Sequence, residues 1–505
     1  MMGRKTAQPE LYVSFSLDSA VPRHHVLRKI AAIVDFEFVR SLAVSYYSWT
    51  GQPSVDPVVI FKLHLLGYLF NIRSERQLSE EAGLNLAWRW FLGYELSDPI
   101  PDHSVLTKAR RRFGPAIYSQ FFQRVVQLCQ HRGLIQGRRL YVDSTLVDAD
   151  AAVDSSRSRR LLRQLPGKPE AYLARLELEA DEGRSRPLRK RRQRLVGEEV
   201  CSRTDPDAAL ISRMVGRKPR LVHKVHLAVD GGRSRIVTSV TAVPAGHGDG
   251  QGLPAILDQH HFNTGERPEE VIADTGYAGT TAYRTCMERG VLPSIRAHPS
   301  VNRRGGWDRD RFIYDQTNDR YICPQAHALV RVHDNVPMQQ HIYRASLADC
   351  RACPVRSQCN PGAKASRTVS RSFDHELLGA VAEHLKTPRA RDALRKRKQF
   401  IELVVADAKV RHGMHRAQRR GRENMLIQAV LTVAAMNLLK LARHSWKTGI
   451  GVAMARRELL SLPMCLDPHL PGLLGAVEFR CRSRRCDYWV VNKGRRLFGN
   501  SLVVV

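Results

Sequence analysis

The sequence predicts a multi-domain α/β protein, with a helical region at the N-terminus and a sheet-containing region after it. The chain has 505 residues, enough for two to four domains with a large buried core. Over residues 20–130 the apolar side chains recur at helical spacing. Further along, short apolar runs end in turn-forming residues, a pattern typical of strands, and two of these runs end on Asp143 and Asp274.

Residues 1–130 are expected to form a helical domain that binds DNA or dimerises. Val58, Phe61 and Leu65 fall on one face of a helix. Asp102 and Ser104 are both candidates for the N-cap of the basic helix that follows. Short helices that end in a basic one are typical of DNA-binding modules. A packing or dimerisation domain with a solvated basic face fits the same pattern, so both interpretations stay open.

The sheet-containing region is expected to be divided along the chain. Its strands and helices fall in residues 138–297 and 386–443, with a basic insert at about 155–220. Between these parts, residues 298–385 follow no regular pattern and hold four cysteines, and residues 444–505 form a tail to which the sequence assigns no role. The clearer elements are a hairpin over Val222–Asp230 and Arg235–Val243, a strand over Glu269–Asp274, and helices over Thr280–Arg289, Pro388–Lys409 and Asn424–Ala442.

The charge balance is the unusual part of the composition. Lys and Arg total 80 against 49 acidic residues, which gives a formal net charge of +31. An excess of this size favours a polyanionic partner, most simply a nucleic acid. The densest basic run, Arg184–Arg194, is typical of segments that contact phosphate without reading sequence. A solvated basic surface or an RNA-binding protein would share this composition.

No membrane or export segment is expected. The N-terminus lacks the apolar core of a signal peptide, and the longest apolar stretch, Val58–Phe70, is interrupted by Lys62 and His64 and is too short to span a bilayer. We therefore expect a cytoplasmic, nucleoid-associated protein with no membrane partner. Its ten cysteines are then expected to be reduced.

Carboxylates at strand ends indicate a metal site. The stretches around Asp143 and, 131 residues later, Asp274 have the same pattern: a short apolar run that ends on an Asp. Two such carboxylates in a very basic chain suit Mg²⁺ or Mn²⁺ held against a phosphodiester. Glu402, on the helix that starts near Pro388, is the strongest candidate for a third ligand. Taken singly, an Asp at a strand end is more often a turn or helix cap.

The helix that carries Glu402 also places cations beside it. Arg395, Lys398, Glu402 and Lys409 follow the spacing i, i+3, i+7 and i+14 and fall on one face of an ideal α-helix. That face suits a site that holds metal and grips a phosphate backbone, although surface ion pairs give the same pattern.

Four cysteines between the second Asp and this helix form a separate group. A Cys-X-X-Cys pair with two further thiols can make a tetrahedral Zn²⁺ site in a reduced protein, and reduced packing cysteines are the alternative. The four are Cys323, Cys350, Cys353 and Cys359, and His327 or His341 could replace one of them.

Taken together, these motifs resemble those of bacterial insertion-sequence transposases of the DDE type. The resemblance runs over about residues 20–443. It rests on Asn85–Phe91, Pro101–Ser104, Tyr141–Thr145, Ser202–Ala208, His223–Asp230, Ala273–Tyr277, the helix from Glu402 to Lys409, His412-Gly413 and Arg420-Gly421.

The resemblance implies an RNase H-like catalytic domain with a mixed sheet and an insertion before the Glu helix. Asp143, Asp274 and Glu402 would bind two Mg²⁺ or Mn²⁺ ions. A homo-oligomer would cut double-stranded DNA at the terminal inverted repeats and join the ends to target DNA. The DNA backbone would be held by Arg395, Lys398, Lys409, Arg411, His412, Arg416, Arg419, Arg420 and Arg422.

The chain departs from the family pattern beside Glu402. Lys398 stands where the family has Arg, and Arg395 stands where it has Tyr. Lys keeps the charge but loses the bidentate fork that Arg offers to phosphate. His247 and Asp249 stand in a position typical of the family, where they either approach the site or form a simple turn.

Two other functions remain as alternatives. A catalytically inactive, transposase-derived DNA-binding protein would fit the departures at Arg395 and Lys398. A basic RNA-binding protein that uses the Arg184–Arg194 run would fit the charge. The intact set of three carboxylates argues against both.

Overall fold

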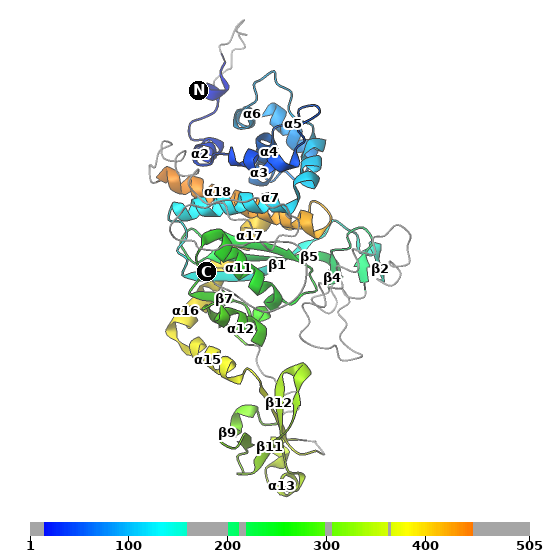
Figure 1. The fold of residues 1–505 in the computed structure, drawn as a ribbon, viewed down its shortest axis with the longest axis vertical. Coiled ribbons are helices and arrows are strands. Elements are labelled where there is room, and N and C mark those ends of the chain that lie inside the picture. The colour runs from blue at the N-terminus through cyan, green and yellow to red at the C-terminus, as the bar shows by residue number, and fades with distance from the viewer. Residues whose placement is uncertain (1–14, 159–199, 212–218, 298–305, 362–364, 448–505) are drawn as a thin grey trace, which may run out of the picture.

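The computed structural model describes residues 15–158, 200–211, 219–297, 306–361 and 365–447. Three parts follow one another along the long axis of the molecule: the N-terminal helices, a central sheet with its covering helices, and a small second sheet (Figure 1). The Arg184–Arg194 run, Cys481, Cys486 and nearly all of the tail lie outside the described residues.

The N-terminal part is helical, as expected. Asp56 caps the buried helix α4. Asp102 caps α7 by accepting the Ser104 N–H at 2.8 Å, so of the two N-cap candidates Asp102 is the one confirmed. The basic helix continues well beyond Phe113, across a kink at Gly114. The helices are α1 (Leu17–Ala20), α2 (Val26–Ile33), α3 (Phe38–Ala43), α4 (Pro57–Leu69), α5 (Glu75–Leu84), α6 (Leu86–Leu92) and α7 (His103–His131).

The central sheet is mixed. Its strand order is β2-β3-β4-β5-β1-β7-β8, with β6 paired to β5; β1 runs antiparallel to β5 and parallel to β7. The predicted hairpin is the pair β5 and β6. Its strands are β1 (Arg139–Asp148), β2 (Ser156–Ser158), β3 (Val200–Ser202), β4 (Ala209–Ile211), β5 (Arg220–Asp230), β6 (Val237–Val243), β7 (Glu270–Ala273) and β8 (Leu292–Ile295).

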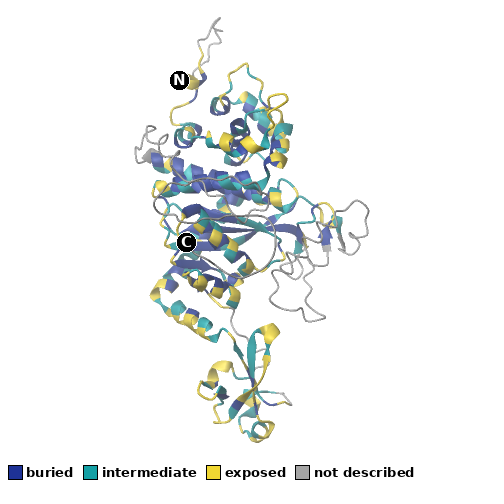
Figure 2. Cartoon of the chain, in the orientation of Figure 1, coloured by how far each residue is buried: buried dark blue, intermediate teal, exposed yellow. Residues whose placement is uncertain are grey.

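Helices cover the central sheet. α11 (Leu253–Thr264) and α12 (Thr280–Glu288) lie over one region of it, and α18 (Arg422–Lys447) packs against β6 and also against α2, α4 and α7. α18 is long and apolar enough to cross a membrane, but 83% of its most apolar window is buried within the protein, as expected for a core helix (Figure 2).

The path to Glu402 is a broken helix rather than the single one predicted. α15 (His375–Lys386) leads into α16 (Pro388–Arg397), followed by a π-helical turn (Lys398–Glu402) and α17 (Leu403–Val410). The ring of Phe400, within the π turn, stacks on Tyr141 of β1 with centroids 4.5 Å apart. That contact holds the π turn against the central sheet.

Residues 306–361 and 365–372, which we call the cysteine insertion, form a five-stranded antiparallel sheet. The sequence pattern there looked irregular because the strands are short and expose apolar side chains such as Ile313 and Val330. The strands pair in the order β13-β12-β11-β10-β9. The elements are β9 (Ile313–Asp315), β10 (Arg320–Ile322), β11 (Ala328–Asn335), β12 (Gln340–Ala345), α13 (Leu347–Ala352), α14 (Arg356–Cys359) and β13 (Thr368–Ser372).

Candidate active site

Two carboxylates meet where the pairing of β1 with β7 ends. Asp274 follows β7, but Asp143 lies within β1, which continues to Asp148, so the prediction that its strand ends there is wrong. These strands are parallel, and Leu140 pairs with Val271. The sequence difference of that pair, 131, is also the difference between Asp143 and Asp274, so the same register sets these two residues beside each other. Asp274 follows β7 directly, and its Oδ1 accepts the Gly276 N–H at 3.1 Å. The repeated sequence pattern therefore corresponds to the pairing register of β1 and β7.

The Asp143 carboxyl lies in a place that opposes its negative charge. Burial raises its pKa, the Arg397 guanidinium lowers it, and the Asp274 carboxylate raises it again, with a net rise above the usual value. The Ser144 N–H donates to Asp143 Oδ1 at 2.8 Å. Two carboxylates that oppose each other's ionisation favour a cation between or beside them.

Glu402 joins this pair through an arginine. Arg397 Nη1 donates to Asp143 Oδ2 at 3.2 Å, and Arg397 Nη2 lies 3.5 Å from Glu402 Oε1. The guanidinium thus bridges the strand carboxylate and the helix carboxylate. Glu402 is about half exposed, whereas Asp143 and Arg397 are largely covered. The site has one face open to solvent.

Arg397 is the site residue that the sequence analysis missed. A regular α-helix would bring Lys398, four residues before Glu402, onto the Glu402 side of the helix. The π turn widens this part of the helix, and Arg397, five residues before Glu402, makes the contact. Lys398 is an exposed side chain. No spacing rule for a regular helix selects Arg397, but allowing one extra residue in the helix would have found it.

The other predicted cations of this helix have separate places. Arg395 is exposed and pairs with Asp392 at 2.8 Å. Lys409, on α17, donates from Nζ to the Leu146 carbonyl of β1 at 3.1 Å. Lys409 therefore ties its helix to the strand that carries Asp143.

A fourth carboxylate, Asp249, lies next to Asp274. A Cβ atom on Gly276 would stand 2.6 Å from Asp249 Oδ2 and 3.1 Å from Asp274 Oδ1, so the two carboxyl groups close on the same glycine. Asp249 Oδ1 accepts the Ser144 hydroxyl at 2.9 Å and pairs with Lys224 Nζ at 2.9 Å. Burial raises the Asp249 pKa, but the hydrogen bond and charge of Lys224, together with the Ser144 hydroxyl, bring it below its usual value. Asp249 approaches the site and is held as an ion.

Two further motif residues fasten the basic loop of residues 411–422. Asp205 is fully buried; its Oδ2 lies 2.9 Å from His223 Nε2, and its Oδ1 accepts the Gly421 N–H at 3.1 Å. Asp207 Oδ2 accepts the Arg422 N–H at 2.8 Å. The Ser202–Ala208 motif therefore positions the loop that follows the Glu402 helix.

Three of the loop's predicted DNA-binding arginines are more than half exposed. Arg416 and Arg420 both lie near Asp150, at 3.8 and 3.6 Å, and Arg411 lies 3.5 Å from Asp407. Exposed ion pairs of this length are weak in water, so these guanidinium groups can turn to phosphate.

Two other members of the predicted DNA-binding set face the N-terminal helices instead. His412 is buried, and its Nδ1 lies 2.8 Å from the Tyr68 carbonyl, so it has no surface for DNA in this structure. Arg419 pairs with Glu75 at 2.8 Å, and Glu75 also pairs with the buried Arg110 of α7. His412 and Arg419 join the loop after α17 to the N-terminal part.

The donor set at Asp143, Asp274 and Glu402 fits a hard divalent cation. All the donors are carboxylate oxygens, and a positive group already lies between two of them. Within the described ranges, no three acidic, His or Cys side chains converge closely enough to form a finished metal site. Since Arg397 holds the space, a metal ion would have to displace it.

The cysteine group lies in the cysteine insertion, at the far end of the molecule from the N-terminal helices (Figure 1). All four predicted thiols line one cavity together with His327. His341 is elsewhere and pairs with Asp334 at 2.8 Å.

Comparisons with known proteins match two segments of the chain. Residues 15–112 match a transposase domain family (DUF772), and residues 322–442 match a transposase DDE domain family. The second segment includes Glu402 but begins after Asp143 and Asp274. No curated protein matches the chain. A solved piggyBac transposase synaptic complex with hairpin DNA is 11% identical, with a TM-score of 0.30 over 88% of this chain and 84% of that one, too low to carry an argument.

Proposed function

We propose that this chain, which matches two transposase domain families, is a DDE-type insertion-sequence transposase that cuts DNA at the ends of its element and joins them to target DNA. Asp143, Asp274 and Glu402 are the proposed metal ligands. The observation that carries this proposal is the sheet register that sets Asp143 beside Asp274, with Arg397 linking Asp143 to Glu402. This core is proposed to be RNase H-like.

The proposed reaction consists of two phosphoryl transfers. Water attacks the phosphodiester at the element end and releases a 3′-hydroxyl. That hydroxyl then attacks a target phosphodiester, forming one bond and releasing a target 3′-hydroxyl. Two Mg²⁺ or Mn²⁺ ions would activate the nucleophile and stabilise the leaving oxygen.

The protein's own side chains hold the carboxylates and the DNA in place. Ser144 and Lys224 fix Asp249 next to Asp274, and Lys409 fixes α17 against β1. With the carboxylates bound to metal, the Arg397 guanidinium would be free to turn to a phosphate, for which its planar fork is suited.

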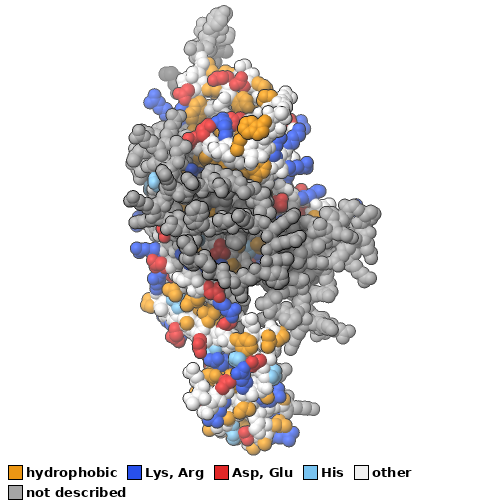
Figure 3. Space-filling view, viewed as in Figure 1, with side chains coloured by type: hydrophobic (Ala, Val, Ile, Leu, Met, Phe, Trp, Pro, Cys, Tyr) orange, Lys and Arg blue, Asp and Glu red, His pale blue; other side chains and the backbone are white. Residues whose placement is uncertain are grey.

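Double-stranded DNA is the proposed partner, bound by a homo-oligomer in the cytoplasm at the nucleoid. The net charge of +31 and the exposed arginines of the 411–422 loop support DNA binding. On the face drawn in Figure 3, Lys and Arg side chains are scattered over the visible described surface and interspersed with acidic ones. The proposed DNA path therefore crosses several elements rather than one patch.

The test is cleavage and joining of linear DNA that carries the sequences flanking this gene, with and without Mg²⁺. Wild type is expected to cut and join only with metal. Asp143→Asn and Glu402→Gln are expected to bind the DNA but do neither. Asp407→Asn, on the same broken helix, is the matched control and is expected to cut normally.

Each alternative has its own outcome in this assay. A wild-type protein that binds the DNA but never cuts would be an inactive derivative. One that prefers structured RNA over the flanking DNA would be an RNA-binding protein. If Glu402→Gln stays active while Asp249→Asn does not, the third metal ligand is Asp249.

A further inference from the structure

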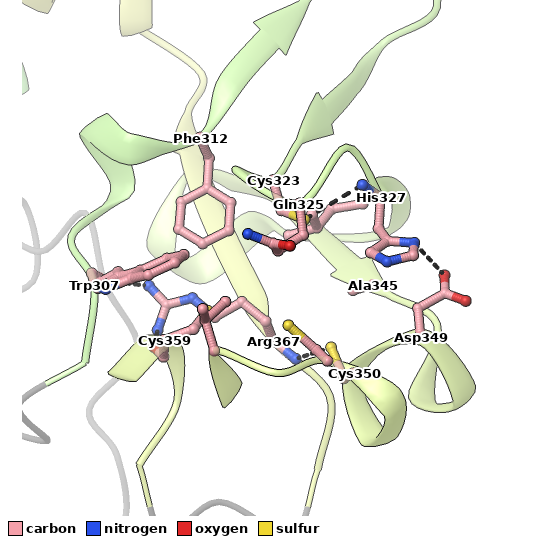
Figure 4. A pocket seen from close by; sticks show the side chains of 13 residues that line it. Trp307, Phe312, Cys323, Gln325, His327, Ala345, Asp349, Cys350, Cys359 and Arg367 are labelled. Carbon is pink, nitrogen blue, oxygen red and sulfur yellow. Dashed lines mark hydrogen bonds and ion pairs between the residues drawn. The ribbon is translucent and has the colours of Figure 1, made fainter. Parts of the chain in front are cut away.

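A small cavity in the cysteine insertion brings together all four of its cysteines. The cavity measures about 30 Å³, and its other walls are mostly apolar, with Trp307, Phe312 and Leu329 among them (Figure 4). None of the four cysteines forms a disulfide. The carboxylate site on the central sheet does not explain this group.

The four thiols come from three separate local structures. Cys323 follows β10 in a tight turn. In this turn Ala326 has a φ of 62°, and the Cys323 backbone carbonyl accepts the Ala326 N–H at 2.8 Å. Cys350 lies in α13, and Cys353 follows the end of that helix. Cys359 is the last residue of α14. Each of these local structures is short, and the cavity is where they meet.

Two of the sulfurs already accept backbone hydrogen bonds. The His327 N–H donates to Cys323 Sγ at 3.3 Å, and the Arg367 N–H donates to Cys350 Sγ at 3.4 Å. Such bonds support a thiolate, because partners of this kind orient metal ligands and stabilise their charge. The turn after β10 and the chain before β13 are therefore shaped to hold charged sulfur.

Arg367 supplies a positive charge at the same place. Its Nη2 donates to the Trp307 carbonyl at 2.6 Å, while its Nε is buried without a hydrogen-bond partner. The four thiols and Arg367 line the same cavity, so the Arg367 guanidinium lies where it can offset part of the charge of thiolates there.

The hydrophobic core of the cysteine insertion is small and contributes little stability. Only a few apolar side chains are fully covered within its described residues, and much of its surface is exposed (Figure 2). Domains of this size bury little apolar surface, and a disulfide or a structural metal is one common supplement to such a core. The buried members are Phe312, Tyr321, Leu329, Tyr343, Ala345 and Val369.

We propose that Cys323, Cys350, Cys353 and Cys359 bind one structural Zn²⁺ ion. Four thiols lose four protons and form four Zn–S bonds of about 2.3 Å. In the described structure no three of these ligands yet converge to that degree, so binding draws the sulfurs inward across the cavity. The ion joins the turn after β10 to α13 and α14. His327, which also lines the cavity, stands next to the site and pairs with Asp349 at 3.7 Å.

The experiment is zinc analysis of the full-length protein, purified without added metal and dialysed against Mg²⁺. We expect about one Zn²⁺ per chain, and its loss in Cys350→Ser and in Cys353→Ser. Cys286→Ala, which removes a buried thiol of α12 far from the cavity, is the control that keeps its zinc. Asp143→Asn also keeps its zinc, which separates this site from the carboxylate site.

Wild-type protein without bound zinc would overturn the proposal, as would full zinc content in the Cys350→Ser, Cys353→Ser double variant. If these variants fail to fold, wild type alone still decides. Replacing the bound metal with Co²⁺ is expected to give intense visible bands of tetrahedral cobalt with thiolate charge transfer in the near ultraviolet. A spectrum without thiolate charge transfer would overturn the assignment.

Discussion

The candidate active site and the cysteine cavity both bring together side chains from distant parts of the chain, but they are supported by different kinds of structure. Asp143 and Asp274 are held by a register between strands that are buried in a large core. The thiols are held by a turn and two short helices over a small core. The sheet that positions the carboxylates folds without a bound metal ion. In the cysteine insertion, by contrast, we expect the bound Zn²⁺ to stabilise the fold itself.

The largest effect is expected from removing one of the carboxylates at the end of β7. Asp274→Asn should slow DNA cleavage by roughly 10⁴-fold or more, because the change removes a charged ligand from a site that acts as a unit. The fold should persist, since the sheet register does not depend on this charge. Single-turnover cleavage and thermal unfolding measure the two effects. Glu383→Gln, an exposed acid of α15, is the control.

Removing zinc should lower the stability of the cysteine insertion more than it slows DNA cleavage. Cys353→Ser is expected to cost the cysteine insertion about 4 kcal/mol of unfolding free energy, as losses of structural metals do. The central sheet should keep its stability. Hydrogen exchange of the two regions measures this difference. Equal loss of protection in both would mean that the two regions are not independent.

Arg397 tests whether the active site needs its internal cation. Arg397→Ala should slow cleavage by about 10²-fold, the usual cost of removing one charge-stabilising group. Arg397→Lys should recover part of the rate, and Lys398→Ala should be close to wild type. If Lys398→Ala proves the more harmful of the two alanine variants, the contact made by the π turn is not the functional one. Single-turnover cleavage at saturating Mg²⁺ gives the comparison.

The smallest effect concerns the close approach of Asp249 to Asp274. Gly276→Ala would put a Cβ atom 2.6 Å from Asp249 Oδ2, and such overpacking costs about 1–3 kcal/mol. Urea unfolding in the absence of metal measures it. Gly279→Ala is the matched control, because no atom lies within 4 Å of its added Cβ and its φ of 167° is extended. An equal cost at both positions would contradict the packing argument.

The same contrast explains what the sequence could predict. The sequence predicted the two strands that carry Asp143 and Asp274, because buried strands leave a strong apolar pattern. In the structure these strands pair with an offset of 131 residues, the same as the spacing of the two Asp residues. The hairpin of β5 and β6 and the capping Asp102 were predicted for equally local reasons. These signals come from short segments whose own residues determine their structure.

The errors arose where longer-range packing decided the outcome. The π turn moved the Glu402 partner from Lys398 to Arg397, and an extra residue in a helix leaves no trace in apolar spacing. His412 was predicted to bind DNA because it lies in a basic loop, but its ring is buried against the Tyr68 carbonyl of α4. The strands of the cysteine insertion were missed because their outer faces are apolar.

The packing of α18 has a consequence for how the protein is made. This helix completes one continuous apolar core with α2, α4, α7 and β6, although it is the last helix described. A ribosome must therefore synthesise about 440 residues before the N-terminal helices gain their final partner. Until then the nascent chain exposes the apolar face that α18 will cover. Truncated chains that end before α18 should aggregate or be degraded, so a shortened gene copy would yield no stable N-terminal fragment to compete for DNA.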